Sequence, residues 1–115
     1  MIVQIWHNPR CSKSRQTLEL LKEKQIDAQV FLYLEEKPNA KLIGETLEKL
    51  GISARELLRK SEDAYKEQNL KDKALTEQQL ISAMVKEPKL IERPIVIRDN
   101  QARLGRPPEQ VLEIL

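Results

Sequence analysis

The sequence predicts an α/β fold in which one small mixed sheet is covered by helices, and three observations lead to this prediction. Short β-branched segments stand near both ends of the chain, the middle carries apolar residues at helical spacing, and turn residues separate these segments. The predicted order is β-α-β, then a helical segment, then β-β-α. At 115 residues the chain is expected to form a single domain, 1–115, with the helical insertion at about 39–90.

The first part of the chain is predicted to be a β-α-β unit. Residues 2–6 are apolar and β-branched and stop at Asn8-Pro9, which is typical of a buried strand. Residues 12–24 form an amphipathic pattern and are predicted to be a helix, with Cys11 or Ser12 at its N-cap. Residues 28–34 are predicted to be a second strand, and the length of the connection favours a parallel pair.

The middle of the chain is predicted to be helical, with cap residues that divide it into separate helices. The predicted boundaries are Asn39 and Gly51 for the first helix, a Ser53–Glu56 capping box for a short second helix, a turn near 64–68, and Thr76 and Pro88 for the last helix.

The last part of the chain is predicted to be a hairpin followed by a helix. Residues 94–97 and 101–104 are the two expected strands, joined by a turn at Asp99-Asn100, and Pro107-Pro108 opens a terminal helix. That helix is expected to carry Val111, Leu112 and Leu115 as its apolar residues. Because Pro94 opens a strand directly after a helix, a cis peptide bond there would let the backbone approach the loop around Cys11.

Composition excludes several classes of site. The chain has 1 cysteine and 1 histidine, so an intrachain disulfide, a Cys-x-x-Cys motif and the common multi-histidine zinc sites are excluded. The 20 basic and 18 acidic residues leave a net charge of +2, which does not call for a nucleic-acid or membrane partner. The chain has neither a long apolar run nor the pattern of a signal peptide at its start, so a cytoplasmic protein is expected.

The segment from His7 to Arg15 places Cys11 in a loop between a strand and a helix. Free amides and the helix dipole at such a position favour a thiolate, and the nearby basic residues add to this effect. The same amides can hold an oxyanion beside the sulfur. The alternative is that Cys11 is an inert, small, buried side chain. The basic flanking residues favour the reactive interpretation.

Other basic residues are candidates for binding an oxyanion or for acting on the thiol. Arg93 and Arg106 each precede a proline at the edge of a predicted strand, and Arg59 follows a short helix. Guanidinium groups suit tetrahedral oxyanions, although most arginines are solvated surface groups. His7 could stabilise the thiolate as a charged imidazole, or it could simply end the first strand.

At these residues the sequence resembles the arsenate reductase family that is coupled to glutathione and glutaredoxin (ArsC-like), and in particular its shorter members. The matching segments are His7–Arg15, Glu-Leu-Leu-Arg59-Lys60, Glu92–Val96, Arg103–Pro107 and Val111–Ile114, in the same order over nearly the whole chain. The resemblance implies a thioredoxin-like core, β-α-β then β-β-α, with a helical insertion between the two halves.

The resemblance also implies an activity and a set of roles. It implies reduction of arsenate to arsenite, with glutathione as co-substrate, glutaredoxin as partner protein, and no bound cofactor or metal. Cys11 would be the nucleophile, and His7 and Ser14 would stabilise its thiolate. Arg59, Arg93 and Arg106 would bind the oxyanion. A single cysteine fits this scheme, since the resolving thiol comes from another molecule.

Two alternatives have no reductase activity. Regulators of the Spx type share the fold and bind RNA polymerase, and some of them carry Cys-x-x-Cys where this chain has Ser14 in the fourth position. The second alternative is a thiol protein that acts on glutathionylated targets.

Overall fold

The computed structural model describes residues 2–115 and has the α/β architecture that the sequence predicts. The elements in chain order are β1 (Val3–Trp6), α1 (Ser12–Glu23), β2 (Ala28–Phe31), α2 (Tyr33–Glu36), α3 (Ala40–Leu50), α4 (Ala54–Leu57), α5 (Asp63–Glu67), α6 (Glu77–Lys86), η1 (Pro88–Leu90), β3 (Ile95–Arg98), β4 (Gln101–Leu104) and η2 (Pro108–Ile114). They fall into two compact units, one made of Met1–Glu36 with Arg93–Leu115 and the other of Lys37–Glu92. The second unit spans the segment in which the sequence predicts a helical insertion.

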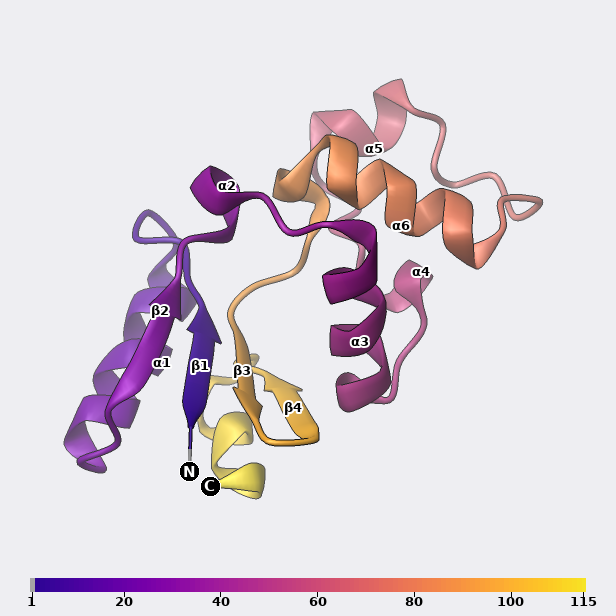
Figure 1. Cartoon of the computed structure of the whole chain (residues 1–115). Helices are drawn as coiled ribbons and strands as arrows, with labels where there is room; N and C mark the ends of the chain where they lie inside the picture. The colour runs from indigo at the N-terminus through magenta and orange to yellow at the C-terminus, as the bar shows by residue number, and fades with distance from the viewer. Residues whose placement is uncertain (1) are drawn as a thin grey trace. The chain divides into compact units, whose positions relative to one another are not determined.

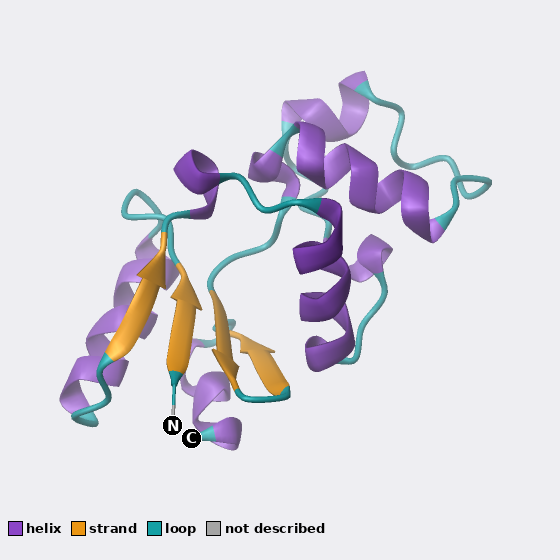
Figure 2. Ribbon diagram, in the orientation of Figure 1, coloured by secondary structure: helices purple, strands orange, loops and turns teal. Residues whose placement is uncertain are grey.

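The first unit is built on a four-stranded sheet of order β2-β1-β3-β4 (Figures 1 and 2). β1 pairs in parallel with β2 and antiparallel with β3, and β3 pairs antiparallel with β4. The predicted β-α-β and β-β-α halves are therefore confirmed. The central strand β1 places Val3 opposite Ala28 on one side and opposite Arg98 on the other. These two pairings set the register of β1 against both neighbours, and the register decides which side chains face each side of the sheet.

The core of this unit lies between the sheet and the two helices α1 and η2. The buried side chains of this cluster are Val3, Ile5, Leu21, Val96, Val111 and Ile114. Burial of each such aliphatic side chain stabilises the fold by roughly 1.5–3 kcal/mol. The terminal helix is a 3-10 helix, in which residues three apart lie on one side. Pro108, Val111 and Ile114 are therefore its buried residues, and the predicted Leu112 and Leu115 are only partly buried.

The second strand is shorter than predicted, because it ends at Phe31 instead of continuing to residue 34. The Leu32 N–H donates to the Glu36 carboxylate, at 2.9 Å, and the chain turns into α2 at Tyr33. The Tyr33 ring stacks on Trp6 with 6.2 Å between ring centroids. Local capping and aromatic packing thus override the β pattern of this segment.

The second unit consists of helices whose ends follow the predicted cap residues. Asn39 Oδ1 accepts from Leu42 N at 2.8 Å, and α3 ends at Gly51, which has a φ of 70°. Thr76 forms a complete capping box with Gln79 at the start of α6.

The predicted capping box at Ser53 is only half formed in the described hydrogen bonds. Ser53 Oγ accepts from Glu56 N at 3.3 Å, as a capping box requires. Glu77 of α6 caps a different donor at the start of α4, since its carboxylate accepts from Ala54 N at 2.8 Å. A complete capping box also has a bond from Ser53 N–H to the Glu56 side chain, and the start of α4 does not show it, so the prediction was wrong in this detail.

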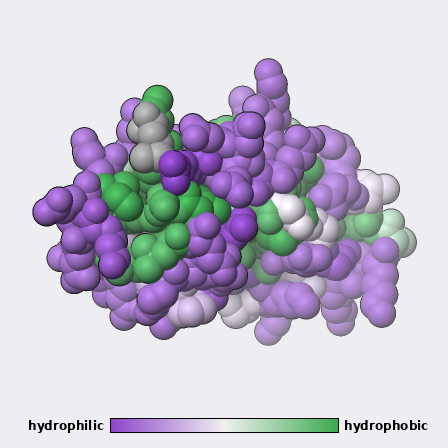
Figure 3. All heavy atoms as spheres, turned by 90° about the horizontal axis from the view of Figure 1, so that it is seen from below, coloured by the Kyte–Doolittle hydropathy of each residue, from purple (hydrophilic) through white to green (hydrophobic). Residues whose placement is uncertain are grey.

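The face of the molecule in Figure 3 is mainly hydrophilic, with smaller hydrophobic areas. Among the described residues, Ile2 and Val30 are the large hydrophobic side chains that are exposed. None of the helices within residues 2–115 is long and apolar enough to cross a bilayer.

Candidate active site

Cys11 lies at the N-cap of α1, where the loop after β1 turns into the helix. Asn8 closes this loop, since its carbonyl oxygen accepts from Cys11 N and its side-chain Oδ1 accepts from Arg10 N, both at 3.0 Å. The thiol is free and half-buried. The N-cap prediction is thus confirmed, and the sulfur lies beside the first backbone amides of α1, which have no acceptor within the helix.

The surroundings of Cys11 lower the pKa of its thiol below the ordinary value. Burial alone would raise this pKa, but three groups that favour the thiolate outweigh it. They are the backbone N–H of Ser14, the guanidinium of Arg93, which acts through a hydrogen bond and through its charge, and the backbone N–H of Lys13. The helix start and an arginine together therefore stabilise the anion.

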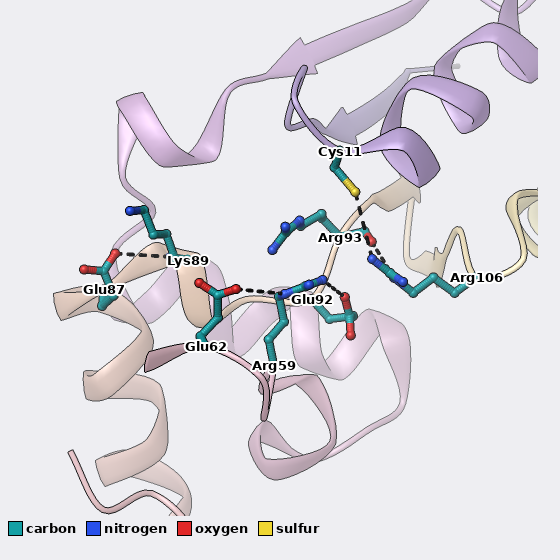
Figure 4. Close-up of polar contacts among 8 residues, drawn as sticks. All are labelled: Cys11, Arg59, Glu62, Glu87, Lys89, Glu92, Arg93 and Arg106. Carbon is teal, nitrogen blue, oxygen red and sulfur yellow. Dashed lines mark hydrogen bonds and ion pairs between the residues drawn. The ribbon is translucent and has the colours of Figure 1, made fainter. Parts of the chain in front are cut away.

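Arg106 also reaches the sulfur, as Figure 4 shows. Its Nη2 lies 3.9 Å from Cys11 Sγ, and its Nε donates to the backbone carbonyl of Arg93 at 2.8 Å. The peptide bonds Arg93–Pro94 and Arg106–Pro107 are both cis, which answers a question that the sequence left open at Pro94. Two of the predicted oxyanion-binding arginines are thus held together beside the thiol.

His7 and Ser14 form a buried hydrogen-bonded pair behind the thiol loop. Ser14 Oγ lies 2.6 Å from His7 Nδ1 and accepts from Asn8 N at 3.0 Å. The pair therefore ties the end of β1 and the loop to the first turn of α1. Ser14, in turn, offers its backbone N–H to the Cys11 sulfur.

Of the two roles considered for His7, the structure does not favour the charged imidazole. Burial lowers the pKa of His7, and the positive charges of Lys22 and Arg15 lower it further. The imidazole is therefore neutral at neutral pH. Any help that His7 gives to the thiolate comes through its hydrogen bond to Ser14.

Arg59 lies in the second unit, just after α4. Its backbone N–H donates to Leu90 O at 2.8 Å. Its guanidinium lies between two carboxylates, with Nη1 2.6 Å from Glu92 Oε1 and Nε 3.6 Å from Glu62 Oε2 (Figure 4). These ion pairs fix the geometry of Arg59 and compensate much of its charge. Its predicted role toward an oxyanion stays a prediction.

Sequence reasoning found the thiol and its arginines but missed the residues that shape the loop. Asn8 was noted only as a strand stop, although an Asn-Pro pair is a known turn signal and could have indicated its role. The site can supply a nucleophilic thiolate and hold an anion against it. Within residues 2–115, no cluster of three or more His, Cys, Asp or Glu side chains is placed to hold a metal ion.

The sheet order and the thiol at the start of α1 define a thioredoxin-like protein with a single-cysteine site. The sequence profile of the ArsC family matches residues 6–114, and the chain belongs to this family. It is 59% identical to the uncharacterized protein YfgD of Escherichia coli, over 98% of this chain and 96% of that protein. It is 45% identical to an arsenate reductase of Haemophilus influenzae, and the match covers 100% of both chains. The solved structure of an arsenate reductase from Vibrio cholerae matches with a TM-score of 0.98 at 52% identity, over 100% of this chain and 98% of that one.

Proposed function

We propose that this chain reduces arsenate to arsenite, with Cys11 as the nucleophile and with glutathione and glutaredoxin as the source of electrons. The observation that carries the proposal is the contact of the chain's one thiol with the first amides of α1, Arg93 and Arg106. This arrangement suits an anionic electrophile that must approach a thiolate. Close relatives named arsenate reductase point to arsenate as that anion.

The first step forms a covalent adduct. The Cys11 thiolate attacks the arsenic atom, a sulfur–arsenic bond forms, and one arsenate oxygen leaves as water after protonation. Arg93 and Arg106 compensate the charge of the remaining oxygens, which otherwise would repel the thiolate. Arg59 is a third proposed ligand of these oxygens.

The next steps deliver two electrons. Glutathione condenses with the adduct, so that a second sulfur–arsenic bond forms and a second water leaves. A glutaredoxin thiolate then attacks the glutathione sulfur, and the pair of electrons in that sulfur–arsenic bond passes to arsenic. Arsenic(V) becomes arsenic(III), while the glutathione and glutaredoxin sulfurs are oxidised to a mixed disulfide. Hydrolysis of the remaining sulfur–arsenic bond releases arsenite and restores the Cys11 thiolate.

Two thiols are oxidised in this scheme, and neither of them belongs to the chain, which has a single cysteine that returns unchanged. Glutathione is therefore a co-substrate and glutaredoxin a partner, and no bound cofactor is needed. We place the reaction in the cytoplasm, where glutathione keeps thiols reduced.

Arsenite release with purified glutaredoxin and glutathione tests the proposal. Cys11→Ser removes the nucleophile with little change in volume and is expected to abolish arsenite release while the protein stays folded. Ser12→Ala, at the exposed first residue of α1, is the matched control and should keep nearly all activity. Arsenite release by Cys11→Ser at the wild-type rate would refute the proposal.

A further inference from the structure

We propose that Gly105 is a positioning residue for the reaction, because the absence of a side chain there lets Arg93 and Arg106 meet the Cys11 thiol. The proposal deepens the proposed function and rests on it for the identity of the substrate. Its effect on the thiol can be measured without any arsenate.

The space at Gly105 is closed on two sides. A Cβ atom built at this position would lie 2.5 Å from Thr17 Oγ1 and 2.7 Å from Pro94 Cγ. Real Cβ atoms essentially never come closer than 3.0 Å to such neighbours. Gly105, Thr17 and Pro94 are all buried, so an added methyl group could not avoid these contacts by turning toward solvent. The φ angle of Gly105 is not positive. Glycine is therefore needed at this position for space and not for an unusual backbone conformation.

Neither neighbour can move away easily. Thr17 Oγ1 donates to Lys13 O at 2.8 Å inside α1, and this bond fixes its rotamer. Pro94 is a rigid ring whose carbonyl oxygen accepts from Gly105 N at 3.0 Å. A methyl group at residue 105 therefore has to displace the backbone near Arg106, the start of β3, or α1.

The same three residues are linked to both arginines that reach the sulfur and to one of the two backbone amides that lower the thiol pKa. Gly105 precedes Arg106, whose Nη2 lies 3.9 Å from the sulfur, and Pro94 follows Arg93. Thr17 is bonded to Lys13, whose backbone N–H also favours the thiolate. Any displacement at Gly105 therefore separates the arginines from the first turn of α1, and the sulfur loses contacts on at least one side.

The first test is Gly105→Ala, with Gly44→Ala as the matched control. A Cβ at Gly44 meets nothing within 4 Å, so the control makes the same chemical change without a contact. The readouts are ultraviolet titration of the single thiol, its alkylation rate at neutral pH, and kcat/KM for arsenate. For Gly105→Ala we expect a raised thiol pKa and slower alkylation. We also expect kcat/KM to fall by roughly 10- to 100-fold, the scale of an active-site displacement of about 1 Å. Gly44→Ala should match the wild type.

A double variant separates positioning from a general loss of structure. Thr17→Ala/Gly105→Ala removes the 2.5 Å contact but keeps the one with Pro94, so its thiol pKa should lie between those of Thr17→Ala and Gly105→Ala. If Gly105→Ala does not fold, the double variant is compared with Thr17→Ala alone, and a raised thiol pKa is again expected. Equal thiol pKa values in either comparison would overturn the proposal. Failure of the wild type to release arsenite would refute the proposed function instead, and would leave the titration result standing.

Discussion

At the scale of single residues, the reactivity of Cys11 is a balance of opposed effects. Burial disfavours the thiolate, while two backbone amides and Arg93 favour it more strongly. The sequence predicted the thiol and the arginines, because their types and their strand–loop–helix context are local information. It left the charge of His7 open, because burial and the nearness of Lys22, which lower the pKa of His7, become visible only when the chain is folded.

Arg93→Lys keeps the positive charge but loses the planar fork of donors. We expect kcat/KM for arsenate to fall roughly ten- to thousand-fold, the scale of one donor in a charged site. Arg10→Lys, at an exposed arginine of the loop that carries Cys11, is the control and should change kcat/KM little. If the two variants had the same activity, Arg93 would act only through its charge.

His7→Asn tests the neutral imidazole through the pH dependence of stability. Burial first, and then Lys22 and Arg15, lower the pKa of His7 in the folded chain. Below about pH 6.5 the unfolded chain therefore binds a proton on His7 more readily than the folded chain does, and stability falls. The wild type should lose more unfolding free energy than His7→Asn between about pH 7.5 and about pH 5, as measured by urea denaturation at each pH. Parallel losses would show that His7 titrates normally.

The same variant separates the two roles considered for His7. Asn keeps a polar atom near the position of Nδ1, so the bond to Ser14 is retained and no charge is lost at neutral pH. We expect Cys11 to titrate at the same pH in His7→Asn and in the wild type. A higher thiol pKa in the variant would instead favour a charged imidazole beside the thiolate.

At the scale of elements, the predictions succeeded where local signals decide and failed where tertiary contacts do. Caps at Asn39, Gly51 and Thr76 were confirmed, because a cap satisfies the backbone of its own helix. The strand predicted to reach residue 34 ends at Phe31, because Glu36 takes the next backbone donor. The space requirement at Gly105 depends on Thr17, which is 88 residues away, so no local pattern could reveal it.

Substitutions at Gly44 in α3 and at Gly51, its C-cap, are expected to change the stability of the protein in opposite directions. Gly44 lies inside the helix with open space for a Cβ, so Gly44→Ala should stabilise the protein by roughly 0.5–1 kcal/mol. Gly51 ends the helix at a φ of 70°, so Gly51→Ala should destabilise it by about 1–2 kcal/mol. Urea denaturation measures both. If Gly51→Ala were as stable as the wild type, the left-handed cap would not contribute to stability.

At the scale of the whole molecule, the central feature is one thiol on a thioredoxin-like unit. The chain belongs to the ArsC family, and its core and helix start place that thiol beside two arginines. A protein with one cysteine can form an adduct with an oxyanion, but it cannot close an internal disulfide to reduce it. The proposed chemistry therefore depends on thiols from other molecules.

Arsenite release with each component omitted in turn is the most direct measurement of this claim. The complete mixture contains the protein, arsenate, glutathione and glutaredoxin, and we expect it to release many arsenite molecules per Cys11. Omission of glutathione or glutaredoxin should stop turnover, and Cys11→Ser should give no arsenite in any mixture. Multiple turnovers without added thiols, or no arsenite from the complete mixture, would contradict the account.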